Sequence, residues 1–279
     1  MDINLNKFNL SQCIHGIMIW PKNDAIIGKC LPLYGEWSEG ENIIMSEYIN
    51  NGDTVIDIGA NIGTTVLSMS KNVGESGKVI AFEPQLIMSQ CLNTNLTLND
   101  ITNVDVYNLA ISNQSGWARL NDQEFSDSGR YGEAGISEKG TIIKTITLDE
   151  IEIESCSLVK IDIEGHEWEA IQGAKGFLLN HKPALYLEAK RDVDGTKKYT
   201  QWLFDNGWNC YWHFAWWYRE NNIKNNNNNI FPGAGDMNIL AIHKDKKQPK
   251  NLLQLKNYNE DWDENEILAF YEENNMKMI

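Results

Sequence analysis

Four ionisable side chains lie close together in the middle of the chain, between Lys160 and His166. If the stretch begins as a strand, Lys160, Asp162 and Glu164 point to one side of it, because side chains alternate along a strand. Burying such groups at the end of an apolar run is costly unless they serve a purpose. Mutual contact and desolvation would shift their pKa values, as in catalytic sites. The stretch predicts an acid–base site, with an ion-paired strand end as the alternative.

A Gly-rich turn earlier in the chain predicts a small-molecule site. It follows an apolar run and reads Asp57-Ile58-Gly59-Ala60-Asn61-Ile62-Gly63. Glycines let the backbone approach a ligand, and ligands bind where parallel strands end. The dinucleotide fingerprint GxGxxG is absent, because an acid precedes the glycines and Asn61 replaces the second one. An acid suits a ligand with sulfonium and ammonium groups and does not help a pyrophosphate.

A carboxylate, Glu83, follows the next apolar run and is followed by Pro84. It comes about 20 residues beyond the turn, the spacing at which an acid meets a ribose. At the end of a second strand it can accept both ribose hydroxyls. A solvated strand end is the alternative, but the Gly-rich turn favours ribose binding.

Short apolar runs alternate with longer amphipathic ones from about residue 54 to residue 189. The predicted strands are Thr54–Ile58, Lys78–Phe82, Val104–Ala110, Leu158–Ile163, Ala184–Ala189, Trp208–His213 and Asn238–His243. The predicted helices are Gly63–Lys71, Gln85–Asn99, His166–Leu179, Lys197–Asn206 and Asp261–Glu273. This alternation predicts an α/β fold with βαβ units around a parallel sheet. We expect seven strands, mostly parallel, with helices on both faces and an antiparallel excursion at the end.

One generous domain accounts for most of the 279 residues. We expect an N-terminal extension over residues 1–50, a main domain over 51–245 and a C-terminal helical tail over 246–279. Residues 112–147 break the alternation and predict an inserted hairpin or long loop. The run Asn225–Asn229 predicts a mobile loop tip.

The formal net charge is −15, from 24 Lys and Arg against 39 Asp and Glu. Such a chain is not drawn to nucleic acid or to anionic lipid, so we expect neither as a partner. The five cysteines form no CxxC pair, which predicts reduced thiols. Because no leader peptide and no membrane-spanning run is apparent, we expect a cytoplasmic protein. The sequence indicates no oligomeric state.

Five motifs together resemble the FkbM family of methyltransferases. They occur in the family's order, between about Tyr34 and Lys190, and read VIDIGANIGTT, IAFEP, LAIS, TLDE and LVKIDIEGHEWEAIQGA. The resemblance implies the class I methyltransferase fold, which is Rossmann-like. It also implies S-adenosylmethionine as the cofactor and S-adenosylhomocysteine as the product. Better-known members methylate hydroxyls of sugars or of sugar-bearing natural products.

The resemblance assigns the cofactor site by position. The Gly-rich turn would hold the methionine and adenosine moieties, Glu83 the ribose, and Ala110 with Ile111 the adenine. Tyr34 and Glu36 would meet the methionyl end in a segment that covers the cofactor, or would belong to a surface segment that leads into a helix. The implied cofactor-binding residues are Tyr34, Glu36, Asp57, Gly59, Ala60, Asn61, Gly63, Glu83, Pro84, Ala110 and Ile111.

Methyl transfer to a hydroxyl is an in-line displacement, which needs alignment and a proton acceptor. We expect Asp162 or His166 to be the general base. Lys160 would stabilise a developing alkoxide or anchor the cofactor, and Glu164 would orient the sugar or the histidine. Asp162 and Glu188 are candidate magnesium ligands, because hard oxygen donors suit that ion.

Seven of the eleven residues from Trp208 to Tyr218 are aromatic. Because aromatic rings pack on the apolar faces of sugars, Trp216, Trp217 and Tyr218, with His213, are candidate acceptor-binding residues. Packing in the core or at an interface is the alternative. The sequence favours an O-methyltransferase that acts on a sugar, glycan or glycosylated metabolite. N- or C-methylation of a peptide or polyketide metabolite and a non-catalytic cofactor-binding module remain as alternatives.

Overall fold

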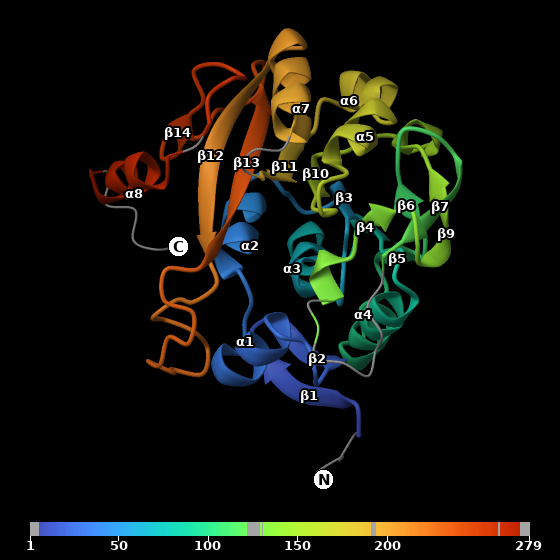
Figure 1. Cartoon of the computed structure of the whole chain (residues 1–279), viewed down its shortest axis with the longest axis vertical. Coiled ribbons are helices and arrows are strands. Elements are labelled where there is room, and N and C mark those ends of the chain that lie inside the picture. The colour runs from blue at the N-terminus through green and yellow to red at the C-terminus, as the bar shows by residue number, and fades with distance from the viewer. Residues whose placement is uncertain (1–5, 122–128, 130, 191–193, 262, 274–279) are drawn as a thin grey trace.

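The computed structural model describes residues 6–121, 129, 131–190, 194–261 and 263–273. A large mixed sheet forms its centre (Figure 1). The parallel strands are β3 (Thr54–Ile58), β4 (Lys78–Phe82), β5 (Val104–Tyr107), β10 (Leu158–Ile161) and β11 (Ala184–Glu188), and the antiparallel ones are β12 (Trp208–Trp216), β13 (Gly235–His243) and β14 (Leu253–Gln254). The order across the sheet is β14-β12-β13-β11-β10-β3-β4-β5. The predicted mostly parallel sheet with an antiparallel end is confirmed.

The predicted number of strands and the predicted path of one strand are wrong, and β10, β12 and β13 differ from their predicted bounds by two or three residues at one end. The sheet has eight strands rather than seven, because the short β14 adds to its edge beside β12. The expected strand Val104–Ala110 leaves the sheet after Tyr107, and Ala110–Ile111 forms β6 in a second sheet. The chain turns at Asn108, whose side-chain amide donates to the carbonyl oxygens of Glu83 and Pro84.

The helices cover both faces of the sheet. They are α3 (Thr64–Val73), α4 (Leu86–Leu98), α5 (Glu167–Gln172), α6 (Lys175–His181), α7 (Asp194–Asp205) and α8 (Glu264–Glu273). The chain steps from β3 through α3 to β4 in one direction, and from β10 through α5 and α6 to β11 in the other. Right-handed crossovers therefore put α3 and the α5–α6 pair on opposite faces.

The helix predicted over His166–Leu179 is broken in the middle. Gly173 lies so close to the loop after β6 that a Cβ there would be 2.1 Å from the carbonyl oxygen of Ser112. The first piece begins at Glu167, whose carboxylate accepts the backbone N–H groups of Ile163 and Gly165. This side chain therefore fixes the loop that joins β10 to α5.

A switch in strand order lies between β3 and β10. From β3 the chain moves outward through β4 to β5, and it then returns to β10 on the other side of β3. Ligands of open α/β sheets bind in the crevice outside the carboxyl ends of the strands at such a point. The Gly-rich turn follows β3 and the acid-rich stretch follows β10, so the topology brings both to this crevice.

Two sequence-distant segments meet on the same side of the molecule. The N-terminal segment forms the hairpin β1 (Phe8–Cys13) and β2 (Gly16–Pro21) and the helices α1 (Ile27–Tyr34) and α2 (Glu39–Ser46). Between β6 and β10 the chain adds β7 (Gly116–Leu120), β8 (Ile136–Ser137) and β9 (Thr141–Ile146), which with β6 form the second sheet. The backbone of Ala25 donates to the carbonyl oxygen of Gly129 over 3.0 Å, which joins the two segments.

The loop between β12 and β13 packs on α1 (Figure 1). The hydroxyl of Tyr34 donates to the carbonyl oxygen of Asn228 and accepts the backbone N–H of Ile230. The side-chain amide of Asn226 donates to the carbonyl oxygen of Leu33. The asparagine run, expected as a mobile tip, is thus hydrogen-bonded to the N-terminal helix. Across the described ranges, every helix is too short or too polar to cross a membrane.

Candidate active site

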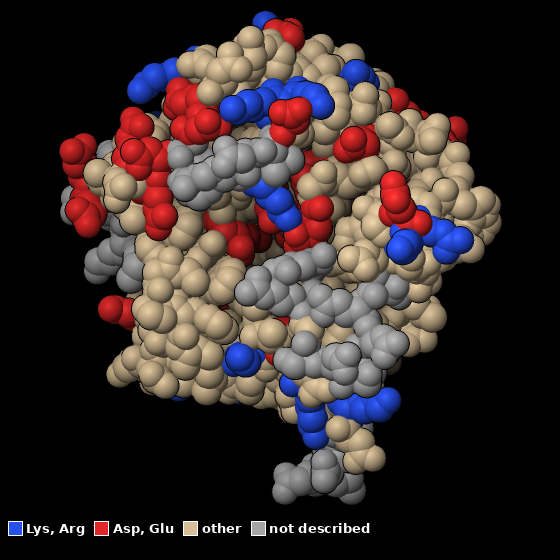
Figure 2. All heavy atoms as spheres, in the orientation of Figure 1, with Lys and Arg blue, Asp and Glu red and all other residues tan. Residues whose placement is uncertain are grey.

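A cavity of about 450 Å³ lies at the carboxyl ends of the parallel strands. Its floor comes from the ends of β3, β4, β10 and β11, and its roof from the two joined segments, with Asp24 and Ile27 on one side and Gly132 and Gly135 on the other. Figure 2 shows acidic side chains gathered inside a hollow in this face. The fold therefore brings the predicted turn, strand ends and insertion to one enclosed space.

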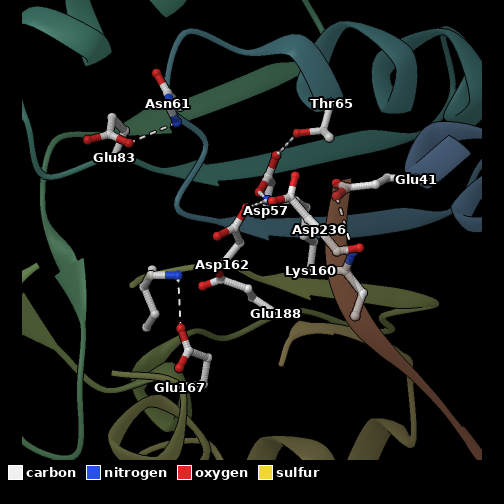
Figure 3. A network of polar contacts seen from close by, with 12 residues as sticks. Glu41, Asp57, Asn61, Thr65, Glu83, Lys160, Asp162, Glu167, Glu188 and Asp236 are labelled. Atoms are coloured by element: carbon white, nitrogen blue, oxygen red, sulfur yellow. Dashed lines mark hydrogen bonds and ion pairs between the residues drawn. The ribbon is translucent and has the colours of Figure 1, made fainter. Parts of the chain in front are cut away.

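Glu83 is fixed at the end of β4 and is 4% exposed. Its two carboxylate oxygens accept the backbone N–H group of Asn61, over 2.8 Å (Figure 3), and that of Gln85, over 2.7 Å. Burial raises the pKa of this carboxyl to about 7. Each oxygen keeps a second lone pair, so the side chain can accept ligand hydroxyls without giving up its backbone donors.

The glycines of the turn serve packing more than ligand approach. Gly59 has φ +90°, and a Cβ there would be 1.9 Å from the carbonyl oxygen of Asp162. A Cβ at Gly63 would be 2.4 Å from the side chain of Leu92. Gly59, Ala60 and Asn61 line the cavity, whereas Gly63 precedes α3 outside the lining. Gly59 therefore lets the loops after β3 and β10 lie close together, and Gly63 lets α4 approach the turn.

Asp57 and Lys160 form a buried ion-pair cluster with Asp162 (Figure 3). The Lys160 Nζ lies 3.0 Å from Asp162 Oδ2 and 3.7 Å from Asp57 Oδ1, and the hydroxyl of Thr65 donates to Asp57 Oδ2. Burial alone would lower the pKa of Lys160, but Asp162 and Asp57 together raise it, so the lysine stays charged. Asp57 Oδ1 has no hydrogen-bond partner, and Asp162, 39% exposed, faces the cavity.

Three further carboxylates extend this cluster away from Glu83 (Figure 3). They are Glu41 from α2, Glu188 from the end of β11 and Asp236 from β13, and all three line the cavity. Burial raises their pKa values, to about 8 for Glu41, about 10 for Glu188 and about 7 for Asp236. Burial therefore favours the protonated form of these acids more than in an exposed carboxyl group.

The remaining predicted catalytic residues also line the cavity. Lys190 forms ion pairs with Glu164 and with Glu188, in the second case over 3.4 Å. Nε2 of His166 is hydrogen-bonded to the hydroxyl of Ser112 over 2.9 Å. Burial lowers the pKa of His166, so its ring is neutral at pH 7.

A divalent metal fits this arrangement poorly. Carboxylate oxygens of Asp162, Glu164 and Glu188 lie within 4.8 Å of one another, which is a possible ligand set. The ammonium group of Lys190, however, already contacts two of these three acids. A metal would have to displace this lysine, and we therefore derive no catalytic step through a metal ion.

Of the candidate acceptor-binding aromatic residues, Trp217 alone lines the cavity. Its indole N–H donates to Asp236 Oδ2 over 2.6 Å, and its ring lies 5.2 Å from that of Trp37. The others pack elsewhere: Trp216 on Phe214, Tyr218 on Tyr34, and His213 against Tyr186, whose hydroxyl lies 2.7 Å from its Nδ1. Complete burial lowers the pKa of His213 to about 3, so it is a neutral core residue.

Tyr34 and Glu36 also lie outside the cavity lining. Glu36 accepts from Arg219 Nε over 2.8 Å, and Tyr34 holds the asparagine loop, so both brace the contact between α1 and the loop after β12. Trp37 and Glu41 take their place at the cavity. Sequence reasoning did not assign Glu41, which lies on α2, and Trp37 lies in the segment between α1 and α2.

The comparisons with known proteins agree with this geometry. The family described as methyltransferase FkbM domain matches residues 57–209. Hexuronic acid methyltransferase AglP of Haloferax volcanii is 29% identical over 135 residues, which are 47% of this chain and 53% of that protein. The chain thus spans about half the length of this curated relative.

Solved structures of low identity are also similar. Methyltransferase FkbM from Methylobacillus flagellatus is 17% identical with a TM-score of 0.48, and the match covers 67% of this chain and 43% of that one. A putative rRNA methylase from Clostridium thermocellum is 12% identical with a TM-score of 0.44, over 75% of this chain and 97% of that one. The strand order described above is that of the class I methyltransferase fold, as the sequence predicted.

Proposed function

We propose, from the premise that this chain belongs to the FkbM methyltransferase family, that it moves a methyl group from S-adenosylmethionine to a hydroxyl of a sugar, glycan or glycosylated metabolite. The observation that carries the proposal is the enclosed crevice at the strand switch, with Glu83 at one end and a group of carboxylates at the other. A sugar acceptor is supported by the name of the hexuronic acid methyltransferase and by the tryptophans at the acceptor end.

The described residues fit the cofactor. Glu83 would hold the ribose hydroxyls, and Phe82, Ala110 and Ile111 would enclose the adenine. The acids that line the cavity at the switch suit a ligand of positive charge. When bound, S-adenosylmethionine supplies an electrophilic methyl group on a sulfonium, and S-adenosylhomocysteine is left as the product.

The protein must align the hydroxyl and receive its proton. We assign the proton to the carboxylate of Asp162, which faces the cavity while Lys160 holds its other side. Burial raises the pKa of Glu188, which favours its protonated form and makes it less available as a base at neutral pH. His166 is the alternative base, but its Nε2 is engaged by Ser112 and its Nδ1 lies 3.6 Å from Glu169. Glu164, fixed by Lys190, would orient the acceptor.

The proposed compartment is the cytoplasm. All five cysteines are buried and unpaired, as suits a protein that works where thiols stay reduced. Detection of the native protein in the cytoplasmic fraction of a cell lysate tests the proposed compartment independently of activity.

The first experiment measures transfer of labelled methyl from S-adenosylmethionine into the sugar, glycan, protein and lipid fractions of source cells. Wild type, Asp162→Asn and the exposed-site control Glu75→Gln run in parallel, each with and without EDTA. We expect label in a sugar-containing fraction, lost in Asp162→Asn, kept in Glu75→Gln and insensitive to EDTA. Label in protein or polyketide material alone would replace the acceptor class. Cofactor binding without any transfer would favour a non-catalytic module, and EDTA sensitivity would restore a magnesium role.

A further inference from the structure

We infer that the acceptor end of the cavity selects a sugar ring that carries no negative charge, with an amino sugar as its best occupant, and disfavours uronates and phosphates. The inference rests on the proposed function, because it names the class of acceptor for the same site. The name of the hexuronic acid methyltransferase alone would suggest a negatively charged sugar as the acceptor, but the match to that relative covers 47% of this chain.

The two ends of the cavity are separated along the sheet. The strands that carry Glu83, Asp57, Lys160, Glu188 and Asp236 lie side by side in the order β4-β3-β10-β11-β13. Four intervals between neighbouring strands amount to about 19 Å, at about 4.8 Å for each interval. Figure 3 shows Glu83 and Asn61 apart from the carboxylates around Lys160. The acids of β11 and β13 therefore belong to the acceptor side and lie far from the ribose side.

The described lining of the acceptor end is strongly acidic. Its carboxylates are Glu41, Asp162, Glu164, Glu188 and Asp236. The two lysines that line it are both already paired: Lys160 with Asp162 and Asp57, and Lys190 with Glu164 and Glu188. A sugar carboxylate would have to compete with an existing carboxylate for either ammonium group.

The raised pKa values of these acids indicate that further negative charge is unfavourable in this space. Burial and the surrounding acids raise the pKa of Glu41 to about 8, of Asp236 to about 7 and of Glu188 to about 10. The cluster thus retains protons at neutral pH instead of ionising fully. An anionic acceptor would add a further like charge, whereas an ammonium group would favour the ionised acids.

Aromatic rings complete the acceptor end. The rings of Trp37 and Trp217 lie 5.2 Å apart, and the Trp217 indole is fixed by its hydrogen bond to Asp236. Tryptophan faces attract cations as well as the apolar faces of sugars. The Asp236 carboxylate and the Trp217 ring therefore lie together, one suited to the ammonium group of an amino sugar and the other to the apolar face of its ring.

The decisive test identifies the methylated sugar. Glycans of the source cells are labelled by the wild-type protein with labelled S-adenosylmethionine and hydrolysed, and their monosaccharides are separated by charge. Label in amino or neutral sugars supports the inference. Label in uronic acids or phosphorylated sugars overturns it while the proposed function stands. Absence of label from every sugar overturns the proposed function itself, and the inference with it.

A matched set of competitors measures the charge preference directly. Methyl glycosides of glucosamine, glucose and glucuronic acid share one ring and compete for labelling of the glycan fraction. We expect inhibition in that order, with glucuronide weaker than glucosamine by at least about tenfold. Equal or stronger inhibition by the glucuronide would contradict the inference.

The Glu164→Gln variant sharpens this competition. It removes one of the two carboxylates that hold Lys190, so the ammonium group, still 3.4 Å from Glu188, binds a sugar carboxylate more readily. We expect the ratio between glucosamine and glucuronide to shrink several-fold in Glu164→Gln and to return in the double variant with Lys190→Gln. Glu75→Gln changes an exposed acid in the turn between α3 and β4, outside the cavity lining, and should leave the ratio unchanged. A ratio that is unaffected by Glu164→Gln would count against the inference.

Discussion

The two ends of the cavity are built in different ways. The cofactor end consists of short contiguous motifs at the ends of neighbouring strands, and backbone N–H groups position its main carboxylate. The acceptor end collects side chains from α2, β11, β13 and the loop after β12, and Trp37, Glu41, Trp217 and Asp236 lie outside the matched residues 57–209. The family therefore specifies the cofactor end, while the flanking segments supply much of the acceptor end.

The largest effect is expected where the two ends meet. In Asp162→Ala, kcat should fall by about 10² to 10⁴, the usual contribution of a general base, because the hydroxyl proton loses its acceptor. Equilibrium binding of S-adenosylmethionine should change far less. If cofactor binding collapsed together with kcat, Asp162 would belong to the cofactor end and the division between the ends would move.

A large loss confined to binding is expected at the cofactor end. Glu83→Ala removes an acceptor from two buried backbone donors and from the ribose, so we expect the Kd for S-adenosylmethionine to rise about 100-fold, from hydrogen bonds to a charged group worth about 1.5–3 kcal/mol each. Calorimetry measures the Kd, with Glu83→Gln as the milder comparison. A variant that binds the cofactor normally but loses the acceptor would reverse the assignment of the two ends.

A smaller effect is expected at the aromatic side of the acceptor end. Trp217→Leu should raise the acceptor KM about tenfold, the size of one packed aromatic contact of about 1.4 kcal/mol, with little change in cofactor affinity. Trp117→Leu is the matched control, because Trp117 is 75% exposed on β7 and lies outside the cavity lining. Equal effects in the two variants would remove Trp217 from the acceptor end.

The last effect concerns stability instead of catalysis or binding, and it is a dependence on pH. The folded pKa of Glu41 is raised above its ordinary value to about 8, so its ionisation opposes folding as the pH rises. The free energy of unfolding of wild type, relative to Glu41→Gln, should fall between about pH 4.5 and pH 8, by at most about 1.4 kcal/mol per pH unit. Denaturant titrations at pH 5 and 8.5 measure this difference. The exposed Glu75→Gln control should show no such trend. If the difference in free energy of unfolding between wild type and Glu41→Gln did not change with pH, the burial of an ionisable Glu41 would be refuted.

The difference between the ends also explains what the sequence could predict. The strands β3 and β4 have the predicted bounds because fully buried parallel strands read as apolar runs. Asp162, Glu83 and Asn61 follow such runs directly, so their place at the crevice follows from the topology. Glu41 was missed because nothing local distinguishes α2 from a surface helix, and the place of Trp37 at the cavity depends on how the segment between α1 and α2 packs. Trp216 and His213 were misplaced because alternation along β12 does not tell a core face from a cavity, and Tyr218, in the loop after β12, because its packing on Tyr34 depends on a distant segment.

The contact between α1 and the loop after β12 bears on how the protein is made. Glu36 and Arg219, which form its ion pair, are 183 residues apart in the chain. At about 5–20 residues per second, a ribosome needs roughly 10–40 s to reach Arg219 after it has added Glu36. During that interval the nascent chain already contains β3, β4 and the Gly-rich turn, while its first helices still lack the loop that braces them. Assembly of the acceptor end is therefore a late event of biosynthesis, complete when β13 has entered the sheet between β11 and β12.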